Sequence, residues 1–270
     1  MATLTSAGIT FSDSTVQTTA ASATPGAVFY QSVINGVQTA IQTDTYNASS
    51  TWTKPGSGTF ALVEVWGAGG SGGRASSTTS ANGGAGGGYR ALLIPLSLLA
   101  STVTVTVGAG GVSRTGSNQA GAAGGSSSFG AMTVGGGAGG AITSTTSRAA
   151  GGTSTYPSTA YAVATAFNQT AATTSAAAGN AYEIGGRGGA NDGLCPIGPL
   201  AADSTISAGA GGGAKVTSTV GNAGGTSTYG GSGSASAATS SAGTAPGGGS
   251  GGATTTSGVG GDGRVKVTVY

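Results

Sequence analysis

Apolar residues recur with a period of two in three parts of the chain, at 60–66, 102–107 and 264–269. This alternation is typical of β-strands that bury one face. Because the first and last of these strands bracket the region between them, we expect a small antiparallel β-sandwich. One face of the strands carries Ala61, Val63, Val65, Val103, Val105, Val107, Val265, Val267 and Val269, and the other carries Phe60, Leu62, Glu64, Trp66, Thr102, Thr104, Thr106, Arg264, Lys266 and Thr268.

Shorter apolar segments are expected to complete this core. Residues 89–100 are apolar nearly throughout and are expected to supply a buried strand or turn, and 126–137 are expected to form a shorter strand. In the N-terminal part, 9–19 predict two short strands around an Asp-Ser turn, and Asn35-Gly36 indicates a hairpin. Residues 1–43 are too few to bury their own apolar surface, so we expect them to form an oligomerisation segment, separate from a second domain at 44–270.

Glycine changes this picture. It makes up 57 of the 270 residues, about one residue in five, whereas a share of roughly 7% is usual. The glycines often recur three apart, which is the period of a polyproline II-type helix without internal hydrogen bonds. Several such helices can bond to one another at backbone distance, and the alternative is a set of flexible linkers. The glycine-rich blocks are 67–73, 83–88, 108–111, 135–140, 185–189, 209–213, 221–225, 230–233, 247–252 and 258–263.

The predicted fold is therefore mostly β and irregular: a small antiparallel β-sandwich with a packed bundle of polyglycine II helices, preceded by a short β-rich N-terminal segment. The segments between glycine blocks would be turns, and two of them, 141–184 and 190–200, are large. Aromatic rings among Ser, Thr and Asn suit a sugar or a protein surface, although they could instead form a small core under a long loop. The residues predicted to bind a partner are Tyr156, Tyr161, Phe167, Tyr182, Asn191 and Asp192.

Composition argues against several classes of chemistry. The net charge is +2 without clustered Lys and Arg, so we expect no nucleic-acid partner. The chain has no histidine and one cysteine, Cys195, which removes the usual general base and metal ligands. Its GxGxxG matches follow no βαβ unit, and its seven carboxylates are not grouped. We expect no enzyme activity, no cofactor and no metal. The N-terminus lacks the pattern of a secretory signal peptide.

Two stretches resemble parts of bacteriophage proteins. The run ITFSDSTVQTTAA (9–21) resembles the N-terminal repeat of many phage tail fibre proteins, although Ser14 stands where glycine is common. TWTKPGSGTFALVEVWGAGGSGG, VTVTVGAGG, SSSFG and the closing GGDGRVKVTVY follow one another within 51–270. Together they resemble the glycine-rich domain of phage tail fibres and adhesins, and more distantly the glycine-rich region of the anaplastic lymphoma kinase receptor family.

The resemblance implies a virion protein, a tail fibre assembled in the cytoplasm of the bacterial host. It would attach to other tail or baseplate proteins through its N-terminus, with Ile9, Phe11 and Val16 as the attachment residues. Its loops would bind a host polysaccharide or outer-membrane protein as receptor. Such fibres are usually homotrimers, whereas free-standing tip adhesins can be monomers. The alternatives are a purely structural virion protein, such as a baseplate spacer or capsid decoration, and a filament-forming surface protein.

Overall fold

The structure is a computed structural model in which two units are distinguished, residues 1–40 and 41–269. Across the described residues the protein is mostly β and irregular, as predicted, and the one helical element is the 3-10 helix η1 (Leu96–Leu98). No helix within this part of the chain is long and apolar enough to span a membrane. The described residues are 3–5, 8–10, 16–17, 40–76, 80–142, 148–155, 186, 188, 202, 204–215 and 221–270.

The N-terminal unit contains a three-stranded antiparallel sheet in the order β1-β2-β3. Its strands are β1 (Thr3–Thr5), β2 (Gly8–Thr10) and β3 (Val16–Gln17). Strands β2 and β3 are the two that the sequence predicts within 9–19, and they pair with each other. The Asp-Ser turn between them and the Asn35-Gly36 hairpin signal lie outside the described residues.

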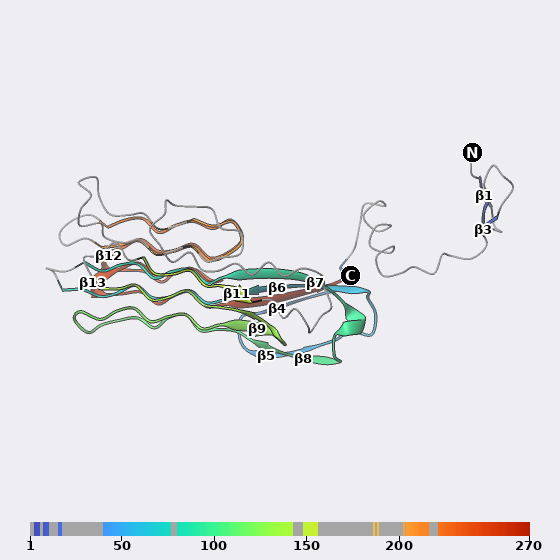
Figure 1. The fold of residues 1–270 in the computed structure, drawn as a ribbon, viewed down its shortest axis with the longest axis horizontal. Helices are drawn as coiled ribbons and strands as arrows, with labels where there is room; N and C mark the ends of the chain where they lie inside the picture. The colour runs from blue at the N-terminus through green and yellow to red at the C-terminus, as the bar shows by residue number, and fades with distance from the viewer. Residues whose placement is uncertain are drawn as a thin grey trace. The chain divides into compact units, whose positions relative to one another are not determined.

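The second unit begins with two sheets (Figure 1), of which the first has the order β4-β14-β6-β7 and the second the order β11-β10-β9-β8-β5. Both are antiparallel, as expected, and β9 and β10 contact β6 across the interface. The strands are β4 (Gln42–Tyr46), β5 (Ser50–Thr53), β6 (Phe60–Trp66), β7 (Tyr89–Pro95), β8 (Thr102–Thr106), β9 (Ser127–Phe129), β10 (Met132–Val134), β11 (Ser154–Thr155) and β14 (Arg264–Val269).

The core lies between these two sheets and uses the predicted faces of the strands. The valines of β6, β8 and β14 belong to one buried cluster, into which Trp52 inserts as the largest fully buried side chain. Its ring meets that of Phe129 edge to face, with centroids 5.5 Å apart. The threonines of β8 are exposed. The alternation in the sequence therefore identified the buried face correctly.

Two details of this core differ from the sequence-based expectation. Residues 126–137 hold two strands, β9 and β10, because Gly130 adopts a positive φ of 54° that reverses the chain between them. Strand β7 is not buried throughout. Its residues alternate between buried and half-buried positions, since one face of its sheet is turned away from the core.

Beyond the strands the chain continues as extended glycine-rich segments, which lie side by side and form the far half of the unit (Figure 1). We call them PGII segments, for polyglycine II. They are the ordered helices that the glycine spacing predicts, as their hydrogen bonds show below. Two very short strands, β12 (Ala237–Thr239) and β13 (Ala253–Thr256), pair in parallel where some of these segments end.

The backbone of PGII segment 67–75 donates to its neighbours with a period of three. Every third N–H group faces the same neighbour, and both of the partners named below run antiparallel to it. The bonds pair Gly67 with Gly88, Gly70 with Ala85 and Gly73 with Asn82 toward segment 81–88, and Ala68 with Gly125, Ser71 with Ala122 and Arg74 with Gln119 toward segment 119–125. This is the threefold geometry of a polyproline II-type helix, whose backbone groups pair between segments rather than within one.

Segment 67–75 lies at the centre of a lattice. Besides its bonds to 81–88 and 119–125, its N–H groups or carbonyls pair with four more segments. These are 108–114 through Gly111, 135–142 through Gly137 and Gly140, 247–253 through Ser250 and Ala253, and 257–263 through Gly261. Backbone hydrogen bonds, rather than a hydrophobic core, therefore hold this half of the unit together.

Glycine is required where two backbones approach each other in this lattice. A Cβ added at Gly70 would lie closer than 3.0 Å to the carbonyl of Ala138. A Cβ added at Gly84 would lie closer than 3.0 Å to the carbonyl of Gly70. Real Cβ atoms essentially never come that near. Ala68 and Ala85 lie in the same two segments and are fully buried, so these segments accept a methyl group at some buried positions. A methyl group is excluded only where it would point at a neighbouring backbone.

Tyr46 packs against the edge of the core and carries a shifted pKa. Its burial, and then the nearby charge of Asp44, raise the pKa of the Tyr46 phenol above its ordinary value of 10.0. The neutral phenol therefore contributes stability that is fully present below the ordinary pKa and is lost as the pH rises through the folded-state pKa. We expect the melting temperature to fall less at alkaline pH in a Tyr46→Phe variant than in the parent. Parallel pH profiles for the two proteins would contradict this.

Candidate functional site

The outer face of the sheet β4-β14-β6-β7 gathers charged and aromatic side chains. The register places Thr45, Lys266 and Glu64 side by side across β4, β14 and β6. Two residues further along, Arg264, Trp66 and Tyr89 form a second row across β14, β6 and β7. Alternate residues of a strand point to opposite faces, so the same pattern that buries the valines turns these six side chains outward.

Contacts within these rows fix the side chains. The ammonium group of Lys266 lies 3.4 Å from one carboxylate oxygen of Glu64, and the Tyr89 hydroxyl donates to the other oxygen at 3.0 Å. The rings of Trp66 and Tyr89 are tilted at 44° with centroids 4.9 Å apart. Glu64 is thus held from both sides, by a cation and by a hydroxyl.

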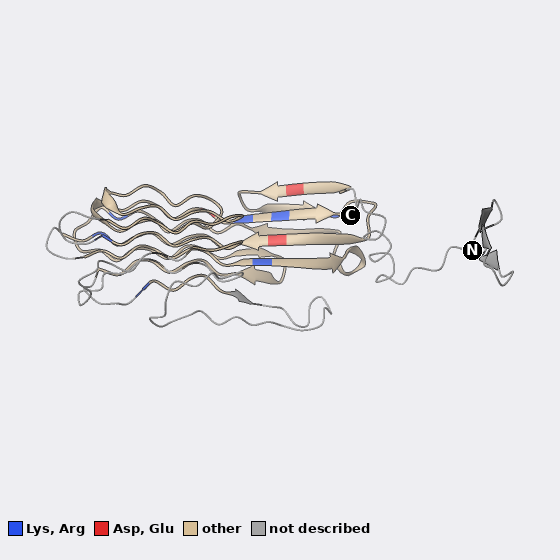
Figure 2. Cartoon of the chain, turned by 90° about the horizontal axis from the view of Figure 1, so that it is seen from above, with Lys and Arg blue, Asp and Glu red and all other residues tan. Residues whose placement is uncertain are grey.

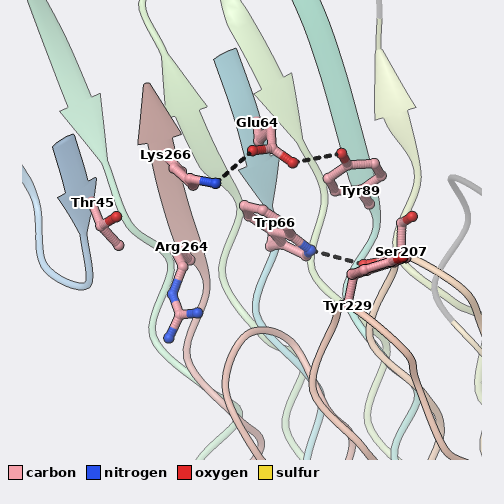
Figure 3. A pocket seen from close by; sticks show the side chains of 8 residues that line it. All are labelled: Thr45, Glu64, Trp66, Tyr89, Ser207, Tyr229, Arg264 and Lys266. Atoms are coloured by element: carbon pink, nitrogen blue, oxygen red, sulfur yellow. Dashed lines mark hydrogen bonds and ion pairs between the residues drawn. The ribbon is translucent and has the colours of Figure 1, made fainter. Parts of the chain in front are cut away.

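The lattice supplies the remaining wall, from the turns where PGII segments come back to the sheet. The indole N–H of Trp66 donates to the carbonyl of Ser207 at 2.8 Å, and the backbone N–H of Tyr229 donates to Ile206 at 2.9 Å. Together these residues line an open cavity of about 420 Å³. Figure 3 shows Trp66 in its middle, the side chains from β14 on one side, and Tyr89, Ser207 and Tyr229 on the other.

Two lining residues are available for a ligand. The Nε of Arg264 donates to the Asn47 side chain at 2.9 Å, whereas the two terminal nitrogens of its guanidinium group have no partner among the described residues. Tyr229 is 69% exposed, although its ring borders the cavity. Trp66 is 5% exposed and forms the floor. The cavity therefore combines an aromatic surface, a carboxylate and a guanidinium group with donors that are free among the described residues. These groups can bind a ligand.

The described residues assemble neither a nucleophile-base pair nor a metal centre in this cavity. Its titratable side chains are Glu64, Tyr89, Tyr229, Arg264 and Lys266. Within the described ranges no group of three or more His, Cys, Asp or Glu side chains could hold a metal ion.

A family comparison matches residues 43–270 to the model of a glycine-rich domain. The chain belongs to this glycine-rich domain family. A comparison with curated proteins gave no match.

The residues that the sequence analysis assigned to receptor binding are not among those described in this glycine-rich domain. Likewise, of the predicted attachment residues, Phe11 is outside the described part, while Ile9 and Val16 lie in β2 and β3, where Ile9 pairs with Gln17 and Val16 with Thr10. The receptor-binding residues concerned are Tyr156, Tyr161, Phe167, Tyr182, Asn191 and Asp192.

The cavity of the glycine-rich domain was missed by sequence reasoning. A signal for half of it was present, because Glu64, Trp66, Arg264 and Lys266 occupy the outward positions of two recognised strands. Ser207 and Tyr229 gave none, since they belong to turns that only the lattice brings to the sheet.

Proposed function

We propose that the protein is a tail fibre protein of a bacteriophage that attaches to the virion by its N-terminal segment and binds a host cell-surface receptor through turns on the PGII lattice. It would act by binding, without enzyme activity, as a homotrimer in the virion. The receptor would be a polysaccharide or an outer-membrane protein. The resemblance of 9–21 and 51–270 to tail fibre sequences motivates the proposal, and one feature of the lattice carries it.

That feature is the direction of the PGII segments. Segment 67–75 continues β6 away from the sandwich, and 81–88 returns to β7; 108–114 and 119–125 do the same between β8 and β9. The described ends of these segments, and the turn at 115–118 that joins 108–114 to 119–125, therefore lie at the end of the lattice far from the sheets. A dense network of backbone bonds holds the described segments, so the connections between them would start from a fixed base, as a receptor-binding tip requires.

The far end also has a distinct charge. Arg74, Arg114 and Lys215 each come at or next to the end of a PGII segment that leads away from the sheets, and Arg148 begins the described range 148–155. Figure 2 shows basic residues in this half of the unit. The described carboxylates are elsewhere: Asp44 and Glu64 are in strands, and Asp262 is near the start of β14. Bacterial surfaces are rich in anionic groups, so a cationic end would favour encounter with a cell.

Cell binding by the full-length protein tests this proposal. We expect fluorescently labelled protein to bind some strains of a bacterial panel in flow cytometry. Arg114→Gln and Lys215→Gln should each lower binding by roughly two- to fivefold at low salt, with a smaller effect at high salt because salt screens exposed charges. A variant lacking 156–184 should lose binding. The deletion leaves 148–155 in place, because the N–H of Gly152 bonds to Gly86 within the lattice.

The matched control is Lys54→Gln. It removes one positive charge from the turn between β5 and β6, at the end of the sandwich away from the PGII segments, and should leave cell binding unchanged. If the parent protein binds none of the strains that its phage infects, the proposal fails in favour of a purely structural virion protein. In that case the lattice would serve as a spacer.

A further inference from the structure

We propose that the cavity on the outer face of the sheet β4-β14-β6-β7 binds an acidic sugar, a pyranose ring that carries a carboxylate. This site is separate from the turns at the far end of the lattice. The proposal goes beyond tail-fibre function and does not depend on it.

The size and lining of the cavity suit one sugar ring with part of a neighbour. Its volume of about 420 Å³ lies at the lower end of the range for small-molecule sites, roughly 300–1,000 Å³. Tyr229 is 69% exposed and lines the same cavity as the buried Trp66, so its ring is open to a ligand. The C–H groups on one face of a pyranose pack well on such a ring, and covering Tyr229 would remove an exposed apolar surface from water.

Arg264 selects for the carboxylate. Its Nε is engaged by Asn47, which leaves the two terminal nitrogens as a pair of parallel donors with no described partner. A carboxylate accepts two parallel hydrogen bonds from such a pair. Lys266 adds a second cation, but Glu64 at 3.4 Å already offsets its charge. The lining therefore has an excess of one positive charge, which suits one carboxylate rather than a polyphosphate.

Sugar hydroxyls would meet fixed partners. One oxygen of Glu64 accepts a hydrogen bond from Tyr89, the other forms the ion pair with Lys266, and both keep further acceptor capacity. The hydroxyl of Thr45 lies across the sheet from Tyr89 on the opposite rim (Figure 3). Because Glu64 is held from two sides before any ligand arrives, little conformational freedom is lost when it accepts a hydroxyl.

The test uses the purified full-length protein and soluble sugars, without cells. Galacturonic acid, glucuronic acid and N-acetylneuraminic acid are compared with neutral galactose and glucose, in ligand-observed NMR and calorimetry. We expect at least one acid to bind and its neutral counterpart to bind more weakly. Tyr229→Ala should lower affinity for the acid by about tenfold, whereas Tyr229→Phe keeps the ring and should keep binding.

Arg264→Gln tests the carboxylate contact. It should lower affinity for the acid by about tenfold or more and abolish the preference for acid over neutral sugar, and Arg264→Lys should restore it only in part, because the paired donors are lost. Lys54→Gln, in the turn between β5 and β6, removes a positive charge that does not line the cavity; it is the control and should bind like the parent. Absence of binding by every acid, or binding that Tyr229→Ala and Arg264→Gln leave unchanged, would overturn the proposal. Neither result bears on cell attachment, which the tests at the far end measure separately.

Discussion

Replacing Gly86 with alanine is expected to destabilise the lattice by about 3 kcal/mol or more, since a methyl group forced into a closely packed site shifts the surrounding backbone. The added Cβ would overlap the carbonyl group of Gly209. That neighbour cannot retreat cheaply, because its own N–H bonds to Gly87 and its carbonyl accepts from Gly186. The strain would have to spread through several hydrogen-bonded segments.

Denaturant or thermal unfolding, followed by circular dichroism, measures this effect. The matched control is Gly56→Ala, because a Cβ built at Gly56, in the turn between β5 and β6, meets no atom within 4 Å. The control should stay within about 0.5 kcal/mol of the parent, as surface substitutions usually do. Equal stabilities for Gly86→Ala and Gly56→Ala would show that segment 81–88 is not packed at backbone distance.

The sequence predicted the sandwich because alternation is a property of each strand by itself. Val63, Val65, Val265 and Val267 are all fully buried on the face that the period of two indicated. The glycine spacing likewise predicted the type of helix in segments such as 67–75, since a period of three is also local. Features that one segment carries alone can be inferred from sequence.

The neighbours of each PGII segment could not be predicted. The side chains of a strand indicate which of its faces is buried, whereas a glycine segment presents the same backbone in every direction. Nothing in the sequence of 67–75 distinguishes 119–125 from 247–253 as a partner, although both bond to it. The outer-sheet cavity depends on this packing, because Tyr229 and Ser207 reach Trp66 only through the order of the segments.

Buried serines show that side chains can take part in the lattice. Ser250→Ala is expected to cost about 2–6 kcal/mol, because it leaves two buried backbone groups unpaired at about 1–3 kcal/mol each. Ser250 is fully buried. Its hydroxyl accepts from the N–H of Gly72 at 2.8 Å and donates to the carbonyl of Gly258 at 2.6 Å. Alanine fits the space but supplies neither bond, so segments 67–75 and 257–263 would each keep a backbone group without a partner.

Ser241→Ala is the matched control for this substitution. Ser241 is exposed, and its hydroxyl makes no hydrogen bond with the described residues, so the same chemical change should leave stability within about 0.5 kcal/mol of the parent. Hydrogen exchange adds a local readout. In Ser250→Ala the N–H of Gly72 should lose protection before those of Gly70 and Gly73, which keep their bonds to Ala85 and Asn82. If Ser250→Ala were as stable as Ser241→Ala, the lattice would have to satisfy Gly72 and Gly258 by shifting, and the PGII segments would be less rigid than a receptor-binding scaffold needs.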